Sequence, residues 1–238
     1  MKKIFITAVG LLMIVSTISN AQDTKKFRFG LQGSPSLAWL KPDTKNIQNN
    51  GFKLNASYGF IIDYKFADNF SFATGFGVCY TGGKLQISYD SLQQDVLVGG
   101  VSTKMTFKGV NASNLYKLQY LELPILLKMT TNEIGYFTYF ANIGAGMGFR
   151  LKAKGDYNYK YLNGIDEPLL KKENDDIKDD ISFIRPSFII GGGAEYSLGG
   201  STKLIASINF NNGLTDILTD KNNKAINNFV SLNIGILF

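Results

Sequence analysis

Alternation of apolar and polar residues constrains this chain more than any other feature, and it is clearest from Phe52 to Phe66. Every second residue of this segment is apolar or aromatic, and most residues between them are polar or small. Successive side chains of a β-strand point to opposite faces, whereas a helix would scatter this pattern around its surface. A tight turn at 67–69 follows, and the alternation resumes from Phe70 to Tyr80. These two segments predict a β-hairpin.

The rest of the chain repeats this pattern and predicts eight strands, joined alternately by short and long connections. The sixth strand is the least regular, because Pro186 lies inside it and a proline cannot donate to a ladder. We expect residues 81–90 and 103–109 to extend one outer hairpin. The strands are placed at 27–40, 52–66, 70–80, 116–129, 136–152, 181–196, 202–212 and 228–238; the short links are 67–69, 130–135 and 197–201, and the long ones are 41–51, 81–115, 153–180 and 213–227.

Short turns on one side and long loops on the other are typical of a transmembrane β-barrel. A soluble lipocalin-like carrier of apolar ligands also alternates, but its outer face would need lysine and glutamate. Here the polar face is rich in small residues such as Gly144, Gly146 and Gly148, which suit the crowded interior of a small barrel. Aromatic residues lie near many strand ends, as an interfacial girdle requires. We therefore predict an all-β fold, an eight-stranded antiparallel transmembrane barrel.

Both ends of the chain point to export. Lys2 and Lys3 precede an apolar stretch, and small residues end the segment, so we predict a signal peptide at 1–21 that is cleaved between Ala21 and Gln22. Residues 22–238 would form the barrel domain in the bacterial outer membrane. The terminal Phe238 looks like the signal that the barrel assembly machinery reads during biogenesis. Outer-membrane lipid and that machinery are the expected partners.

Charged residues fall on the polar face of several strands. An eight-stranded barrel is too narrow for an open pore, and buried charges need partners, so we expect a paired network that plugs the lumen. Glu195 and Lys203 are equidistant from Gly199, and direct hairpin pairing would set them opposite each other. Arg150 or Arg185 is the expected partner of Glu122, and a narrow ion path is the alternative. The predicted lumen charges are Arg28, Asp63, Lys65, Glu122, Lys128, Arg150, Arg185, Glu195 and Lys203.

Composition argues against several functions. The chain has no histidine, which removes the commonest general base, and its single cysteine, Cys79, forms no intramolecular disulfide. Scattered lysines give a net charge of +6 without a basic run, so no nucleic-acid partner is predicted. An acidic run at 173–180 could offer Asp175, Asp176, Asp179 and Asp180 to calcium, but it lacks EF-hand spacing, and a solvated loop is preferred. We predict no enzyme, metal or cofactor.

Two segments resemble the PorT-like outer-membrane β-barrel family. One is Tyr-Leu-Glu-Leu-Pro-Ile-Leu-Leu-Lys at 120–128, and the other is Gly-Leu-Thr-Asp-Ile at 213–217. The resemblance implies a barrel, and the founding member is associated with protein secretion and surface maturation. The matching motif residues are Tyr120, Leu121, Glu122, Pro124, Lys128, Gly213 and Asp216.

The preferred function is a structural or interaction barrel whose outer loops contact a partner at the surface. An accessory role in a protein secretion or surface-maturation apparatus is the first alternative, and a lipocalin-like carrier is the second.

Overall fold

Eight long strands form the body of the chain in a computed structural model, which describes residues 26–98, 101–161, 170–220 and 223–238. The predicted signal peptide and its cleavage site at Ala21 and Gln22 lie outside these residues. No helix in the described ranges is long and apolar enough to cross a membrane. The long strands are β1 (Phe27–Pro42), β3 (Lys53–Ala67), β4 (Phe70–Val98), β5 (Val101–Thr130), β6 (Phe137–Tyr161), β8 (Ile184–Gly199), β9 (Thr202–Asp216) and β10 (Ala225–Leu237).

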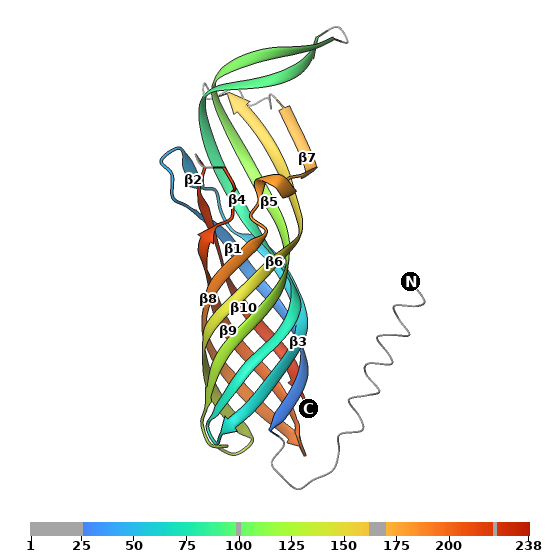
Figure 1. The fold of residues 1–238 in the computed structure, drawn as a ribbon, viewed down its shortest axis with the longest axis vertical. Helices are drawn as coiled ribbons and strands as arrows, with labels where there is room; N and C mark the ends of the chain where they lie inside the picture. Colours follow the sequence, from blue (N-terminus) through green and yellow to red (C-terminus); the bar gives the residue numbers. More distant parts are fainter. Residues whose placement is uncertain (1–25, 99–100, 162–169, 221–222) are drawn as a thin grey trace, which may run out of the picture.

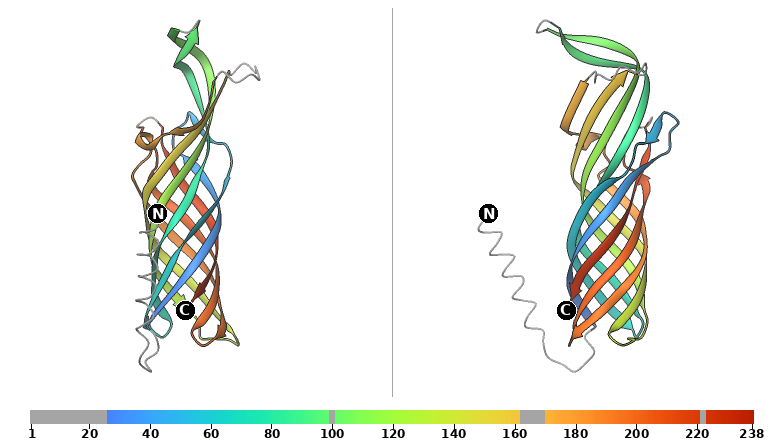
Figure 2. Two further views of the ribbon diagram at one scale, coloured as in Figure 1. Left: turned by 90° about the vertical axis from the view of Figure 1, so that its right-hand side faces the viewer. Right: turned by 180° about the vertical axis from the view of Figure 1, so that it is seen from behind.

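These strands close into a ring. Each pairs antiparallel with the next long strand along the chain, and β1 pairs with β10 over Gly30↔Leu237 to Pro42↔Ala225. The predicted eight-stranded antiparallel barrel is therefore confirmed. Figures 1 and 2 show a tall, tilted barrel with the short turns and the C-terminus at one end and the long hairpins at the other. We refer to these as the turn end and the hairpin end.

Much of the chain predicted as long loops is strand. Strands β4 and β5 stay paired from Phe70↔Met129 out to Val98↔Val101, so 81–98 and 101–115 are the two arms of a hairpin that rises above the barrel. Strand β6 likewise runs to Tyr161 and pairs with a short strand, β7 (Leu170–Asp176). A short β2 (Ile47–Asn49) pairs with β4, and a 3-10 turn, η2 (Lys178–Asp180), follows β7. These segments lack long apolar alternation because they extend beyond the barrel wall.

The register of the β8–β9 hairpin differs from the prediction. Glu195 lies opposite Ile205 rather than Lys203, and Lys203 pairs with Ser197. The cause is the position of the turn: Gly199 pairs with Thr202, so the turn is centred after Gly200 and not on Gly199, and Gly199 and Gly200 have φ values of 106° and 63°. An irregularity between Ser197 and Gly199 then changes the register by one further residue.

The proline in β8 is accommodated at the end of a ladder. Pro186 lies opposite Met147 of β6, whereas pairing with β9 begins one residue later, at Ser187↔Gly213. No β9 acceptor therefore requires its missing N–H. The strand begins at Ile184 instead of at 181, and Ile181 forms an isolated bridge with Leu218.

Candidate functional site

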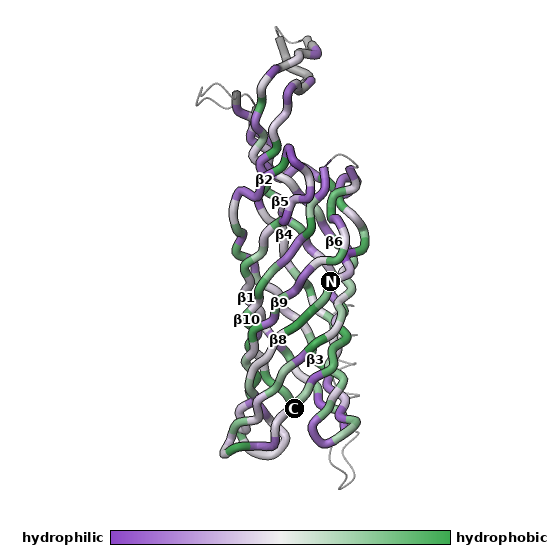
Figure 3. Tube along the Cα trace, turned by 90° about the vertical axis from the view of Figure 1, so that its left-hand side faces the viewer, coloured by the Kyte–Doolittle hydropathy of each residue, from purple (hydrophilic) through white to green (hydrophobic). Residues whose placement is uncertain are grey.

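The barrel wall is apolar outside and polar inside. Large apolar side chains along the strands face outward, and Leu54, Ile125 and Ile208 are 78%, 67% and 60% exposed. By contrast, Asp63, Glu195 and Arg185 face the lumen and are at most 1% exposed. In Figure 3, green segments run along the wall and purple residues concentrate in the connections at its ends. A soluble barrel requires the opposite arrangement, so the lipocalin-like alternative is excluded.

A compact charge cluster fills the lumen near the turn end. Two buried carboxylates, Asp63 of β3 and Glu195 of β8, share the cations Arg28 of β1 and Lys128 of β5. Arg28 contacts Asp63 at 2.9 Å and Glu195 at 2.7 Å, and Lys128 contacts them at 2.8 and 2.6 Å. Lys203 adds a contact to Glu195 at 3.5 Å, although the two residues are not paired in register. The cluster thus ties together five strands across the lumen.

A second cluster surrounds Arg185 nearer the hairpin end. Its guanidinium contacts Glu122 Oε1 at 3.5 Å and donates to Asn211 Oδ1 at 2.6 Å and to the Asn227 carbonyl at 3.0 Å. The ring of Phe229 lies 5.1 Å from the guanidinium carbon. Asn211 also donates to Glu122 at 3.3 Å. Of the two predicted partners of Glu122, Arg150 and Arg185, the structure therefore has Arg185.

Two predicted lumen cations lie elsewhere. Arg150 donates to the backbone carbonyls of Lys178 and Ile181, and so fastens the chain around η2 to the hairpin end of the barrel. It pairs with Tyr120, one inward position nearer the hairpin end than Gly148, which is the residue opposite Glu122. Lys65 is 41% exposed and contacts Asp68 in the adjacent turn at 3.7 Å, because it lies at the open mouth.

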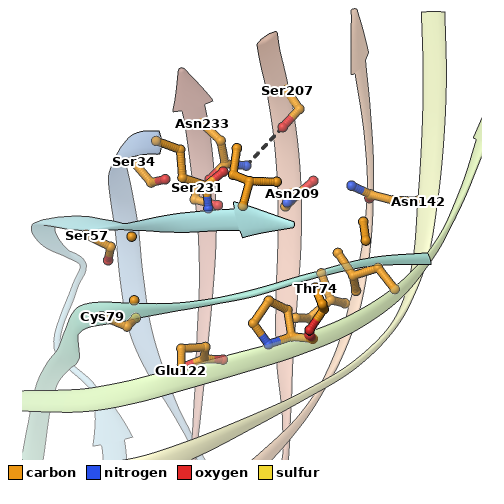
Figure 4. A pocket seen from close by; sticks show the side chains of 18 of the residues that line it. Ser34, Ser57, Thr74, Cys79, Glu122, Asn142, Ser207, Asn209, Ser231 and Asn233 are labelled. Carbon is orange, nitrogen blue, oxygen red and sulfur yellow. Dashed lines mark hydrogen bonds between the residues drawn. The ribbon is translucent and has the colours of Figure 1, made fainter. Parts of the chain in front are cut away.

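A small cavity of about 140 Å³, lined by apolar and polar side chains, lies between the two clusters. Figure 4 shows Ser34, Asn142, Asn209 and Asn233 among the side chains around it. Asn142 Oδ1 and Asn209 Oδ1 are buried and have no hydrogen-bond partner in the described structure. Because one water occupies about 30 Å³ in the liquid, this volume suits a few waters rather than an organic ligand, whose pockets usually exceed about 300 Å³.

The hairpin end of the lumen is filled by apolar side chains, and the turn end is open. Leu118 and Tyr120 of β5 are almost fully buried in the apolar cluster. At the turn end, a cleft of about 560 Å³ is lined by Arg28, Glu133 and Lys203 among others. The buried apolar cluster comprises Leu40, Ile47, Leu85, Ile87, Tyr116, Leu118, Tyr120, Ala153, Ile177, Ile181, Ile217 and Ala225.

The acidic run lies on the surface of the hairpin end. Asp176 pairs with Lys178 at 3.1 Å, and hydrogen bonds from the side chain and the backbone of Lys178 lower the pKa of Asp176. Within the described ranges, no group of three or more histidine, cysteine, aspartate or glutamate residues is arranged to hold a metal ion. Asp175, Asp179 and Asp180 are not gathered with Asp176 into such a group in these ranges.

The motif residues occupy structural positions in the wall. Tyr120 packs in the apolar cluster, and the Pro124 carbonyl accepts a hydrogen bond from Thr74 at 2.7 Å. The Gly213 N–H donates to Asn228 Oδ1 at 3.0 Å, and a Cβ there would meet the Asn227 carbonyl at 2.7 Å. Leu121 lies in the outer wall, while Asp216 and Phe238 lie at the ends of β9 and β10.

Two amides of the second cluster were not predicted from the sequence, whereas the inward parity of Lys128 placed it among the lumen charges, and it is 2% exposed. Asn211 and Asn227 were missed because neutral amides are common on a barrel's inner face and give no distinguishing signal. Thr81 joins them through a hydrogen bond to Asn227 Oδ1 at 2.8 Å.

A family model described as "Outer membrane protein beta-barrel domain" matches residues 20–219. The chain belongs to this outer-membrane β-barrel family. Its apolar exterior is accordingly the surface that faces lipid in the bacterial outer membrane, as the localisation prediction required.

Several solved structures are similar to this outer-membrane barrel at low sequence identity. Neisserial surface protein A is 12% identical, covering 88% of this chain and 95% of that one, with a TM-score of 0.45. The protease OmpT of Escherichia coli is 10% identical, covering 93% and 99%, with a TM-score of 0.40. OprG of Pseudomonas aeruginosa is 15% identical, covering 92% and 99%, with a TM-score of 0.39. No curated protein matches the chain.

Proposed function

We propose that this protein is a rigid outer-membrane anchor with a closed lumen, whose hairpins bind a partner outside the cell. The observation that carries the proposal is the contrast between the two parts of the chain. The wall encloses two charge clusters and an apolar cluster, whereas the β4–β5 hairpin continues far beyond the wall. A lumen filled in this way opposes conduction, and long paired hairpins offer surface for recognition.

The same contacts support a plug rather than an ion path. An ion crossing the lumen would have to displace the Arg185 guanidinium, which is 0% exposed and bonded to two strands, and then pass the apolar cluster. Desolvating an ion beside apolar side chains is costly. We therefore expect no steady conductance from the folded barrel in a planar bilayer.

We propose that the protein is a member of the PorT-like family. The motif at 120–128 supports this, because it supplies both an outward apolar row and the inward residues Glu122 and Lys128. An accessory role in secretion rests only on that resemblance, and copurification with translocon subunits would favour it. We propose no enzymatic activity, because the buried carboxylates of both charge clusters are engaged by buried cations. A cleaved signal peptide predicts a mature protein beginning at Gln22, which N-terminal sequencing would detect.

Cysteine labelling in intact cells tests the orientation and the accessibility of the hairpin. Lys104 is exposed on the β4–β5 hairpin, and Ser201 is exposed in a short turn at the other end. Lys104→Cys should react with a membrane-impermeant maleimide in intact cells, and Ser201→Cys should react only after lysis. Cys79 is 5% exposed and provides a low background. Labelling of Ser201→Cys but not Lys104→Cys in intact cells would overturn the proposal.

Crosslinking then tests for the partner. A photocrosslinker carried at Lys104→Cys should capture a discrete surface component, whereas the same reagent at Ser201→Cys should not. Equal products from both positions would argue against recognition by the hairpin.

A further inference from the structure

The apolar exterior ends at a definite level on β4, β5 and β6. Residues paired across these strands form rows, and the last wholly apolar outward row is Val78–Leu121–Phe149. The next outward rows toward the hairpin end are Tyr80–Gln119–Lys152, Gly82–Lys117–Lys154 and Lys84–Leu115–Asp156. Four lysines therefore lie directly beyond the lipid-facing surface, and we call Lys84, Lys117, Lys152 and Lys154 the lysine belt.

The belt carries positive charge that the described residues neutralise only in part. Lys152 and Lys154 are exposed, and neither lies within ion-pair distance of a described carboxylate, although Lys154 faces Asp176 of β7 in the ladder. Lys117 contacts Asp156 at 2.6 Å, and it lies directly opposite Lys154 in the ladder. Like charges facing each other destabilise a sheet unless an anion is shared between them. This arrangement is therefore one that a bound anion would stabilise.

The opposite rim of the same wall is built differently. Its outward residues are aromatic or apolar, including Phe70, Met129 and Tyr139, and its turns carry the acids Asp68 and Glu133. Arg28 and Lys128 near that rim turn inward to the charge cluster, and Lys65 contacts Asp68 in the turn. Outward lysines next to the apolar band are thus a feature of the hairpin end of this wall.

We propose that the lysine belt binds the phosphate groups of an anionic lipid in the leaflet that surrounds the hairpin end. The acyl chains would lie against the apolar rows, which end at Leu121 and Phe149, and the lysines would reach the phosphates from their flexible stems. Lysines next to a bilayer attract anionic headgroups, with an effect of about fivefold in affinity for each residue. With the hairpin end outside, as proposed above, the ligand is a phosphorylated outer-leaflet lipid.

Titration of the full chain, folded in neutral detergent, with bisphosphorylated lipid A tests the proposal. The double variant Lys152→Gln/Lys154→Gln should bind at least about tenfold more weakly at low salt. The matched control is Lys104→Gln/Lys108→Gln, which removes the same charge from exposed sites on the distant hairpin and should bind as wild type does. Lys152→Arg/Lys154→Arg should restore binding, and high salt should weaken the wild-type interaction.

Several results would overturn the proposal. Equal lipid A affinity of the wild type and the double glutamine variant would show that the belt does not contribute. If the wild type bound dephosphorylated lipid A equally tightly, the phosphate groups would not be what the belt recognises. If it bound inositol hexakisphosphate equally tightly, the belt would be a site for soluble polyanions and not for a lipid. Each variant is first checked for the heat-dependent gel shift of a folded barrel, and Lys152→Gln alone replaces the double variant if that protein does not fold. Because binding is measured in detergent, it stands apart from the orientation test of the proposed function.

Discussion

Replacing Arg185 with methionine would separate a structural lumen network from an incidental one. Methionine keeps an unbranched stem of similar length but removes the charge and every donor of the guanidinium. In the folded barrel, Glu122 would lose its cation, and Asn211 Oδ1 and the Asn227 carbonyl would lose their donors. Arg185 is 0% exposed, so water would not readily replace those contacts.

The expected magnitude follows from these contacts. Removing one partner of a buried charge pair costs about 3–5 kcal/mol, because the remaining charge is left uncompensated. Glu122 keeps a hydrogen bond from Asn211 at 3.3 Å and is 13% exposed on its side chain, so we expect a loss near about 3 kcal/mol. Glu122→Gln should cost less, about 1–2 kcal/mol, because Arg185 retains its two other acceptors.

The assay is urea unfolding of the barrel in phospholipid vesicles, followed by the gel shift between folded and unfolded forms. Asp175→Ala, at an exposed position, is the control and should unfold as the wild type does. Glu122→Ala should likewise destabilise the barrel more than Asp175→Ala. The combined Arg185→Met/Glu122→Gln variant should be more stable than the sum of the single losses predicts, because neither charge is then left alone.

A loss below about 1 kcal/mol for Arg185→Met would refute the reasoning, since that is the range of a single exposed ion pair. Strict additivity of the two single variants would also contradict a direct contact between Arg185 and Glu122.

Three further outcomes follow from other parts of the barrel. Lys128→Met should cost about 3 kcal/mol in the same assay, because two buried carboxylates would then depend on one arginine, and a wild-type value would contradict the cluster. Gly193→Ala places a Cβ 2.1 Å from the Ala206 carbonyl and should destabilise by about 1–3 kcal/mol, whereas Gly33→Ala meets nothing within 4 Å and should be neutral. For Asp156, partial burial acts to raise the carboxyl pKa, but hydrogen bonds from Lys117 and the Asn174 N–H, together with the charges of Lys117 and Lys171, outweigh it and the pKa is lowered. The pair thus stabilises the hairpin above the ordinary aspartate pKa and is lost as the pH falls through the lowered value, so Asp156→Asn should speed hairpin amide exchange about twofold at pH 7 and leave it unchanged in acid.

The local pattern of the sequence determined the strands and their two faces. Alternation along 52–66 and 70–80 predicted β3 and the start of β4 within a residue, because side-chain direction in a strand depends only on parity, but it did not extend β4 to Val98. Parity also placed Asp63, Glu195 and Arg185 on the inner face. The exterior was identifiable as lipid-facing because the polar face carried small residues instead of surface charges.

Only closure of the barrel decided which of these residues meet. Lys128 reaches both Asp63 and Glu195, which lie 65 and 67 positions away on strands that are not its neighbours, because the ring brings opposite walls within one side-chain length. The position of the β8–β9 turn set Glu195 opposite Ile205 instead of Lys203. The carbonyls of Lys178 and Ile181, beyond the barrel wall, became the partners of Arg150 in place of Glu122. Alternation in one strand specifies faces, but partners depend on the register and curvature of all eight strands.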